Sequence, residues 1–196
     1  MHHRRLLVTT LFALTSFGYD CLGQTARLQL QSQPGDFIGQ GGTFDITYQS
    51  PTDSISTQIR RSLPAGPAEL LWVLDSPAAG NQFATLFFGT DALGIPIQPG
   101  TYPNAQRADF ASAGHPGLDV SFQNRGSNTL TGSFTINYVT FTPGSGGIET
   151  FRATFEQHSE GATPALLGTF TYAVPEPASI GLILGGVALV MRRRGH

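Results

Sequence analysis

The sequence predicts an all-β fold: an antiparallel β-sandwich of the jelly-roll or immunoglobulin-like type, flanked by an N-terminal signal helix and a C-terminal hydrophobic helix. Three observations predict it. Apolar and polar residues alternate in short segments, as in half-buried strands. The 196 residues include 24 glycines and 13 prolines, which favour turns. Only 12% of the residues are charged and every basic one is an arginine, unlike a protein built from long Glu- and Lys-rich helices.

The pattern of the central part of the chain predicts nine or ten short strands separated by turns. Alternation marks strands at residues 28–31, 43–48, 118–122 and 134–138. Apolar runs at 70–74 and 83–88 indicate strands buried on both faces, with companions at 148–158 and 166–173. Turns rich in Pro and Gly fall at 34–36, 39–42, 99–100, 116–117 and 143–147. Residues 53–67 could be a strand that leads into a long loop.

The N-terminus has the three parts of a secretory signal peptide, which we assign to residues 1–23. Two histidines and two arginines precede an apolar run at 6–18, and small residues follow it. We favour cleavage near Gly23; the alternative is a buried N-terminal helix. The only cysteine, Cys21, lies in this segment. The mature chain is therefore expected to have no disulfide and no Cys-based metal site.

The C-terminus, residues 174–196, combines a proline-rich motif, an apolar run and an arginine cluster. The motif residues are Val174, Pro175, Glu176, Pro177, Arg192, Arg193 and Arg194. The apolar run at 180–191 is shorter than the roughly 20 residues that span a bilayer, so it would hold the membrane only transiently. The arginines place the tip in the cytoplasm and the preceding domain outside.

This C-terminal pattern resembles the PEP-CTERM protein-sorting signal, also known as an ice-binding-protein C-terminal domain. The resemblance implies export, transient anchoring in the inner membrane and recognition by an exosortase. It also implies removal of the helix and delivery to the cell surface or extracellular matrix. The ice-binding name concerns the tail and not the domain before it.

The domain between the two signals, residues 24–173, is acidic. Its six arginines face eleven Asp and Glu residues, which gives a net charge of −5. An acidic domain without lysine is a poor partner for nucleic acid, so we expect none.

Four residues, Tyr102, Arg107, Glu156 and His158, are the candidate binding residues of this domain. Glu156 and His158 belong to the densest group of ionisable residues, at 151–160. Strand alternation places them on the face opposite Phe151, Ala153 and Phe155. That arrangement fits an acid/base or metal site, or an ordinary solvated strand face. Zinc would need more ligands than the one other histidine of the domain, His115, supplies.

Other polar and aromatic residues also have two interpretations each. Asp36 and Asp45 could offer oxygens to Ca²⁺, although Asp36 also suits a side-chain-stabilised turn after Pro34 and Gly35. No metal and no cofactor is expected. Trp72 is assigned to the core. Two interpretations, an exposed platform for stacking on sugars or ordinary packing at the rim of the sandwich, fit Tyr48, Tyr102 and Tyr138.

A second resemblance covers most of the domain. The segments at 33–39, 99–107, 116–118, 125–128 and 155–161 are similar to motifs of an uncharacterised family of secreted bacterial β-domains. Cysteine commonly stands there at the positions of Ser127 and Ser159. The resemblance implies that these two serines are close in space, because they would replace one disulfide.

No nucleophile motif appears, so we expect a protein that is not an enzyme. The function predicted is adhesion or polysaccharide binding at the cell surface or in the extracellular matrix. A secreted glycan hydrolase is one alternative, because paired carboxylates need not be adjacent in sequence. A purely structural matrix component is the other.

Overall fold

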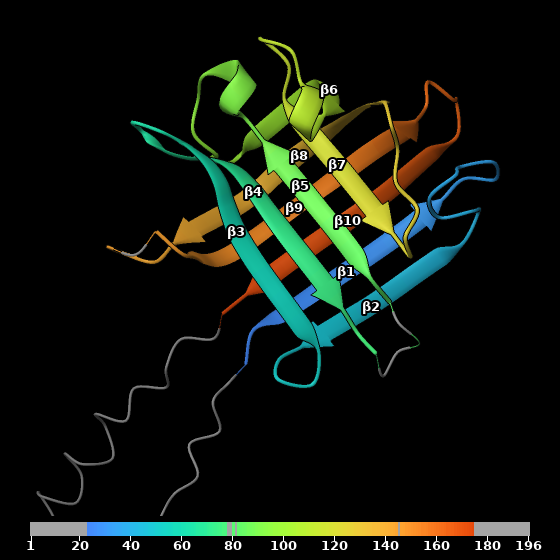
Figure 1. Ribbon diagram of the computed structural model, residues 1–196, viewed down its shortest axis with the longest axis horizontal. Coiled ribbons are helices and arrows are strands. Elements are labelled where there is room, and N and C mark those ends of the chain that lie inside the picture. The colour runs from blue at the N-terminus through green and yellow to red at the C-terminus, as the bar shows by residue number, and fades with distance from the viewer. Residues whose placement is uncertain (1–22, 78–79, 81, 145, 175–196) are drawn as a thin grey trace, which may run out of the picture.

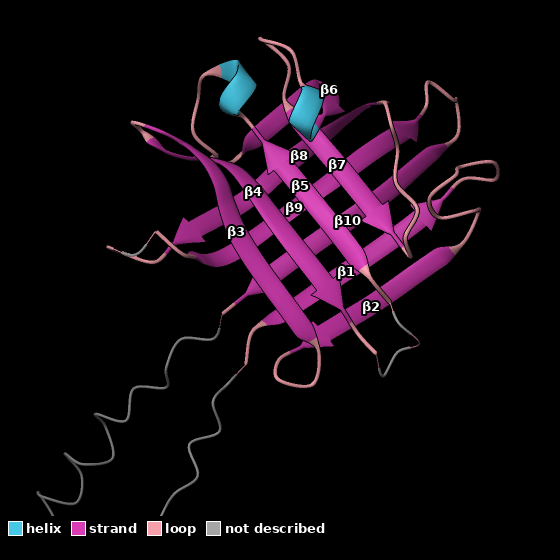
Figure 2. Ribbon diagram, in the orientation of Figure 1, coloured by secondary structure: helices cyan, strands magenta, loops and turns pink. Residues whose placement is uncertain are grey.

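The computed structural model describes residues 23–77, 80, 82–144 and 146–174. These residues form ten strands joined edge to edge in one sheet, in the order β2-β1-β10-β9-β8-β6-β7-β5-β4-β3. The strands are β1 (Thr25–Ser32), β2 (Thr43–Gln49), β3 (Ser54–Leu63), β4 (Gly66–Asp75), β5 (Ala84–Gly89), β6 (Gly100–Arg107), β7 (Gly117–Phe122), β8 (Leu130–Phe141), β9 (Ile148–Ser159) and β10 (Ala165–Ala173). Two short 3₁₀ helices, η1 (Asp91–Leu93) and η2 (Ala108–Phe110), are the only helices of the described residues (Figure 2).

The sheet folds over itself and is nearly closed into a barrel. Strands β3, β4, β5 and β7 form one layer that crosses a second layer of β2, β1, β10, β9 and β8 (Figure 1). Strand β6 belongs to both layers: it pairs antiparallel with β8 and then, through its last two residues, parallel with β7. The prediction of an antiparallel sandwich is therefore wrong, because the sheet is continuous and mixed.

The physical reason for this error is that alternation reports which face of a strand is buried, not which strand lies beside it. The pairs Gln106–Gly117 and Arg107–Leu118 make the parallel contact, and neither has a signature in the sequence. The two flanking helices and both processing signals fall almost wholly at residues 1–22 and 175–196, outside the described part. Strand alternation itself is confirmed in β1, where Leu28 and Leu30 are buried between exposed or half-buried neighbours.

The space between the layers is filled by aromatic side chains that meet around Trp72 of β4. Its ring lies 4.5 Å from that of Phe151 on β9 and 5.1 Å from that of Phe170 on β10, measured between centroids. Phe88 of β5 packs on Phe151 at 5.2 Å. Trp72 is fully buried, so its assignment to the core is confirmed. These tilted and edge-to-face ring contacts add to the stabilisation that comes from burying apolar area between the layers.

Gln157 joins the two layers through polar contacts in the interior. Its side chain projects from β9 and is fully buried. Its Oε1 accepts the Val120 backbone N–H of β7 at 2.9 Å, and its Nε2 donates to the Val120 carbonyl, also at 2.9 Å. The parallel β6–β7 pairing ends at Leu118, so Val120 has no partner strand on that side. The Gln157 amide supplies the two hydrogen bonds that a neighbouring strand would otherwise make.

We predict that Gln157→Leu lowers the free energy of unfolding by about 2–4 kcal/mol, because it leaves the N–H and C=O of Val120 buried without partners. Urea unfolding followed by fluorescence of Trp72 measures the change. Gln31→Leu on exposed β1 surface is the matched control and should change stability by less than about 0.5 kcal/mol. Equal effects of the two substitutions would contradict a bridging role for Gln157.

Candidate functional site

An exposed phenylalanine marks the outer surface at the end of β6. Phe110, the last residue of η2, is 70% exposed, against 54% for Phe37 and 40% for Tyr138, the other exposed large apolar residues of the described part. The Arg107 guanidinium lies 5.0 Å from the centre of the Phe110 ring. Because η2 follows β6 directly, the corner of the sheet itself presents this ring to solvent.

Arg107 is held in place from two sides. Its Nε donates to Asp119 Oδ2 of β7 at 3.0 Å, and its Nη1 donates to the carbonyl of Asn128 at 3.2 Å. Burial raises the pKa of the Asp119 carboxyl, whereas the hydrogen bond and charge of Arg107 act in the opposite direction. The guanidinium thus joins β6, β7 and the segment before β8.

Two depressions of about 440 Å³ each adjoin Arg107, and both are lined by Arg107 and Asn128. The first lies over β5 and β7, and its further lining includes Thr85, Phe87, Asp109, Asp119, Ser121 and Asn124. The second is lined by Gln106, Phe110, Thr129, Leu130 and Thr131. Each is within the size range of small-molecule sites. We call the two together the Arg107–Phe110 site.

The wall formed by Asn128 is fixed by contacts with the end of β9. Ser127 Oγ donates to Ser159 Oγ at 2.8 Å, and both serines are buried. The Asn128 N–H donates to Glu160, and this bond lowers the pKa of the Glu160 carboxyl. The closeness of Ser127 and Ser159 that the second resemblance implies is therefore confirmed.

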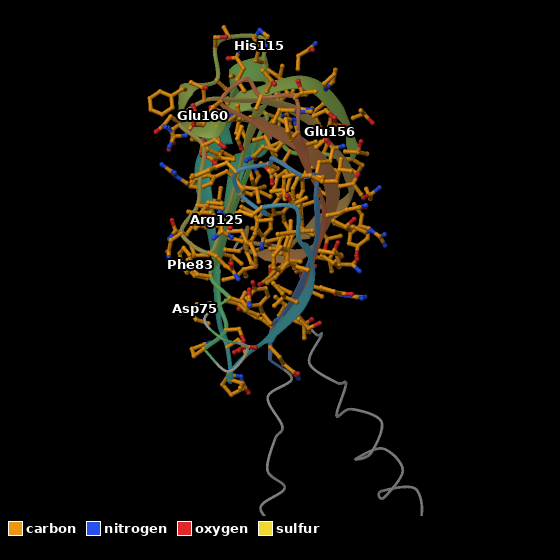
Figure 3. The ribbon with its side chains drawn as sticks, turned by 90° about the vertical axis from the view of Figure 1, so that its right-hand side faces the viewer. Asp75, Phe83, His115, Arg125, Glu156 and Glu160 are labelled. Carbon is orange, nitrogen blue, oxygen red and sulfur yellow. The ribbon has the colours of Figure 1, made fainter. Side chains whose placement is uncertain are left out.

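Arg125 closes the far side of the first depression. Its Nε donates to the Ile38 carbonyl at 2.6 Å, and its Nη2 donates to Gln123 Oε1 at 3.1 Å. The side chain is thereby tied to the loop between β1 and β2. Figure 3 shows Arg125 on the side of the layer that holds β5 and β7, with Glu156 on the opposite side of the molecule.

Charges beside the site are paired. Arg60 of β3 lies over the Phe87 ring at 5.2 Å and contacts Asp109 at 3.4 Å. Its neighbour Arg61 contacts the fully buried Glu69 at 3.1 Å. Burial raises the pKa of the Glu69 carboxyl, and the Arg61 charge opposes this shift. The carboxylates that line the first depression, Asp109 and Asp119, are each paired with a guanidinium, whereas the lining Arg125 is bonded to the Ile38 carbonyl and to Gln123.

Of the four predicted binding residues, only Arg107 lines this site. Tyr102 is 5% exposed, stacks on Phe134 at 4.9 Å and donates its hydroxyl to the Gln98 carbonyl. Tyr48 is fully buried and donates to the Gln82 carbonyl. The expected exposure of these two tyrosines is wrong, and Tyr138 alone is exposed. Tyr48 shares the strand phase of buried Ile46, a signal that the sequence did contain.

Glu156 and His158 lie on the outer face of β9, as alternation predicted. His158 Nε2 is 2.9 Å from Glu156 Oε1, and Nδ1 is 2.8 Å from the Thr163 carbonyl. His158 is paired across the strands with Thr131, which lines the second depression. The pair therefore neighbours the Arg107–Phe110 site without lining it, and both nitrogens of the ring already have a protein partner.

The two aspartates considered for Ca²⁺ lie in separate environments. Buried Asp36 accepts hydrogen bonds from Ser32 Oγ at 2.7 Å and from the Gly39 N–H at 2.8 Å, which confirms its role in the turn. Asp45 forms a double hydrogen bond with Arg27, and this bond lowers the pKa of its carboxyl. Among the described residues no group of three or more His, Cys, Asp or Glu side chains is arranged to hold a metal.

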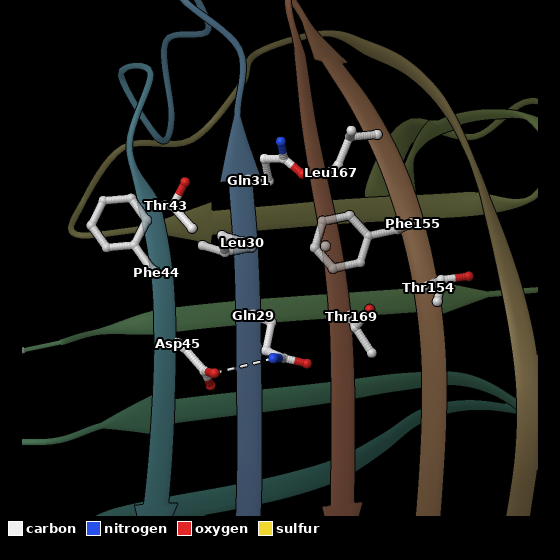
Figure 4. A pocket seen from close by; sticks show the side chains of 11 residues that line it. Gln29, Leu30, Gln31, Thr43, Phe44, Asp45, Thr154, Phe155, Leu167 and Thr169 are labelled. Carbon is white, nitrogen blue, oxygen red and sulfur yellow. Dashed lines mark hydrogen bonds between the residues drawn. The ribbon is translucent and has the colours of Figure 1, made fainter.

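A third depression, of about 490 Å³, lies on the outer face of the second layer (Figure 4). Glutamine and threonine side chains line it, among them Gln29, Thr154 and Thr169. Phe155 and Gly168 also line it, and the Phe155 ring packs over Gly168, where a Cβ would lie 2.1 Å from that ring. Its one charged side chain, Asp45, is already paired with Arg27. It lacks the exposed aromatic ring found at Phe110.

Of the sorting-signal residues, Val174 is described and donates its N–H to Glu149; Pro175, Glu176, Pro177 and Arg192–Arg194 lie outside the described residues. Within the described part, no helix has the length and apolar character needed to cross a membrane. Comparison of the chain with protein-family models, curated proteins and solved structures found no match.

We predict that the double substitution Ser127→Cys and Ser159→Cys forms a disulfide, because the two Oγ atoms already face each other. Joining residues 32 positions apart should raise the free energy of unfolding by about 4 kcal/mol in the oxidised protein relative to the reduced one. Thiol titration and urea unfolding measure the two effects. Single Ser127→Cys is the control, and free thiols persisting in the oxidised double variant would contradict the geometry.

Proposed function

We propose that this protein is exported, is sorted by an exosortase through residues 174–196, and binds polysaccharide at the cell surface or in the extracellular matrix. The sorting part rests on the PEP-CTERM pattern of Pro175, Glu176, Pro177 and Arg192–Arg194. The binding part rests on the Arg107–Phe110 site. Adhesion through glycan binding needs no catalytic group, and it accords with a chain that has no nucleophile motif.

The observation that carries the proposal is the exposed Phe110 ring, which lines the second depression beside Arg107 and Asn128, the two residues shared with the first depression. A sugar ring offers an apolar face of C–H groups to an aromatic ring and hydroxyls at its rim. In the depression that Phe110 lines, the hydroxyl of Thr131 and the amides of Gln106 and Asn128 provide acceptors and donors for such hydroxyls. The carboxylate of Asp119 provides acceptors in the adjoining one. The two depressions adjoin each other at Arg107 and Asn128, which suits a chain of sugars more than a single one.

The pairing of Arg107 beside Phe110 favours a glycan without charged groups. The Arg107 guanidinium is already bound to Asp119, so an acidic sugar stacked on Phe110 would have to displace that carboxylate. Displacement would leave a half-buried carboxylate without its partner, which is unfavourable. We therefore place uncharged polysaccharides before uronic-acid polymers as the ligand.

The hydrolase alternative finds its support in Asp109 and Asp119, two carboxylates that line the same depression. Hydrolysis of a glycosidic bond needs one carboxyl group free to donate its proton. Both carboxylates are instead paired with a guanidinium, Asp119 with Arg107 and Asp109 with Arg60. This pairing favours a binding role, in which Asp119 positions Arg107.

We expect Phe110→Ala to weaken binding to the glycan selected on an array of neutral and acidic polysaccharides by about tenfold to a hundredfold, because a stacking ring is lost. Tyr138→Ala is the matched control, since Tyr138 is also exposed but lies outside the site, and it should leave the affinity unchanged. Isothermal titration measures both. The proposal fails when no glycan binds, or when the two variants lose equal affinity.

We expect protein recovered from the surface or medium of an exosortase-carrying host to lack Arg192–Arg194, because processing removes the apolar run and the arginines that follow it. Intact-mass measurement identifies the cut. A variant with Pro175→Ala and Pro177→Ala, which alters the motif and leaves the apolar run and arginines in place, should retain the full C-terminus. Recovery of surface protein with all three terminal arginines would overturn the sorting assignment.

A further inference from the structure

The two border strands of the sheet, β2 and β3, differ in how well they resist pairing with another chain. An unpaired border strand exposes backbone N–H and C=O groups that can extend the sheet. Strand β3 is bent by register shifts between Ile59 and Ser62 and carries Arg60 and Arg61. Strand β2 has an unbroken register with β1, no proline and no basic residue. Register shifts and two adjacent arginines thus protect β3 from pairing with another chain, whereas β2 has neither kind of protection.

The backbone groups that β2 offers can be identified from its pairing with β1. Hydrogen bonds from Ser32 N to Gly42 O at 2.9 Å and from Ser50 N to Gln24 O at 3.0 Å mark the hydrogen-bonded pairs at the two ends of this ladder. Antiparallel pairs alternate, so the even-numbered residues of β2 face β1. The N–H and C=O groups of Thr43, Asp45 and Thr47 therefore point to the open border.

The end of this border is already capped. Gln49, the next residue in the same phase, donates its N–H to Asp53 Oδ2 at 2.8 Å and accepts the Asp53 N–H at 2.9 Å. Beside the open part lies a depression of about 380 Å³, lined by residues 43–47 and Gln82. Thr43, Asp45 and Thr47 are all exposed. The available border is thus a short strand segment that an incoming strand can reach (Figure 1).

We propose that this border binds a second copy of the same chain, β2 against β2, to form a symmetric dimer with a continuous sheet. In the antiparallel register centred on Ile46, Asp45 pairs with Thr47 of the second copy, and each such pair exchanges two backbone hydrogen bonds. Ile46 and Tyr48 are already buried within each copy, so the backbone hydrogen bonds made by Asp45 and Thr47 carry the contact.

Charge selects this register over its neighbour. Pairing centred on Asp45 would place the two Asp45 carboxylates directly opposite each other, which is unfavourable. In the register centred on Ile46, each Asp45 faces an uncharged threonine and keeps its own partner, Arg27, at 2.6 Å on β1. A symmetric contact of this kind closes on itself and gives a dimer rather than a filament.

Substitution of Thr47 tests both the contact and its register. We expect Thr47→Glu, which faces Asp45 of the second copy, to weaken the dimer about tenfold, and Thr47→Lys to maintain or tighten it. Thr47→Pro should leave only monomer, because it removes the N–H that reaches across the border but none that bonds to β1. Sedimentation equilibrium of the full-length chain in non-ionic detergent, over about a hundredfold range of concentration, measures each dissociation constant.

Thr154→Glu, an exposed substitution on central β9, is the matched control and should leave the dimer unchanged. Thermal unfolding checks that each variant is folded, so that loss of dimer reports on the border. A wild-type chain that is monomeric at every concentration overturns the proposal. Equal dissociation constants for Thr47→Glu and Thr47→Lys overturn it as well, as does a loss of dimer in Thr154→Glu equal to that in Thr47→Glu.

Discussion

The structure depends on the place where the sheet turns from one layer into the other. Strand β6 makes that turn by pairing with β8 through most of its length and with β7 through only Gln106 and Arg107. Past this point β7 has no strand on that side, and the buried amide of Gln157 satisfies Val120 in its place. A buried backbone N–H or C=O without a partner is strongly unfavourable, so this contact lets the two layers diverge and enclose the aromatic core.

The same corner produces the candidate site. Because β6 ends where it touches β7, its last residue, Arg107, meets Asp119 of β7 and the Asn128 carbonyl before β8 at once. The chain then continues into η2 and exposes Phe110. The Asn128 wall is tied to the end of β9, the strand that also carries Gln157, through Ser127, Ser159 and Glu160. The groups of the site are therefore held by the closure of the fold and not by a flexible loop.

Most of the strands can be predicted from the sequence, but the arrangement where β6 meets β7 cannot. Alternation of period two locates β1, β2 and β9 and places Glu156 and His158 outside, because side-chain direction depends on local phase. The approach of Arg107 to Asp119 depends on parallel pairing between strands that are consecutive in sequence, and no local pattern encodes it. Phe110 has no strand phase from which exposure could be inferred. Tyr102 was misassigned because its burial depends on stacking against Phe134 of β8.

The Arg107–Phe110 site lies where β6 meets β7, and the unpaired border lies at β2, so glycan binding and dimer formation use different parts of the protein. Strand β2 ends the sheet at the opposite extreme of the layer from β8 and β6, so pairing of β2 with a second copy leaves the Arg107–Phe110 site uncovered (Figure 1). A β2-paired dimer would then present two such sites on one rigid sheet. Once one site has bound a repetitive polymer, the second site is held near the same chain at a high effective concentration. The dimer therefore binds the polymer more tightly than a single weak site does. Glycan affinity of isolated domains can therefore be low while retention in a polysaccharide matrix is high.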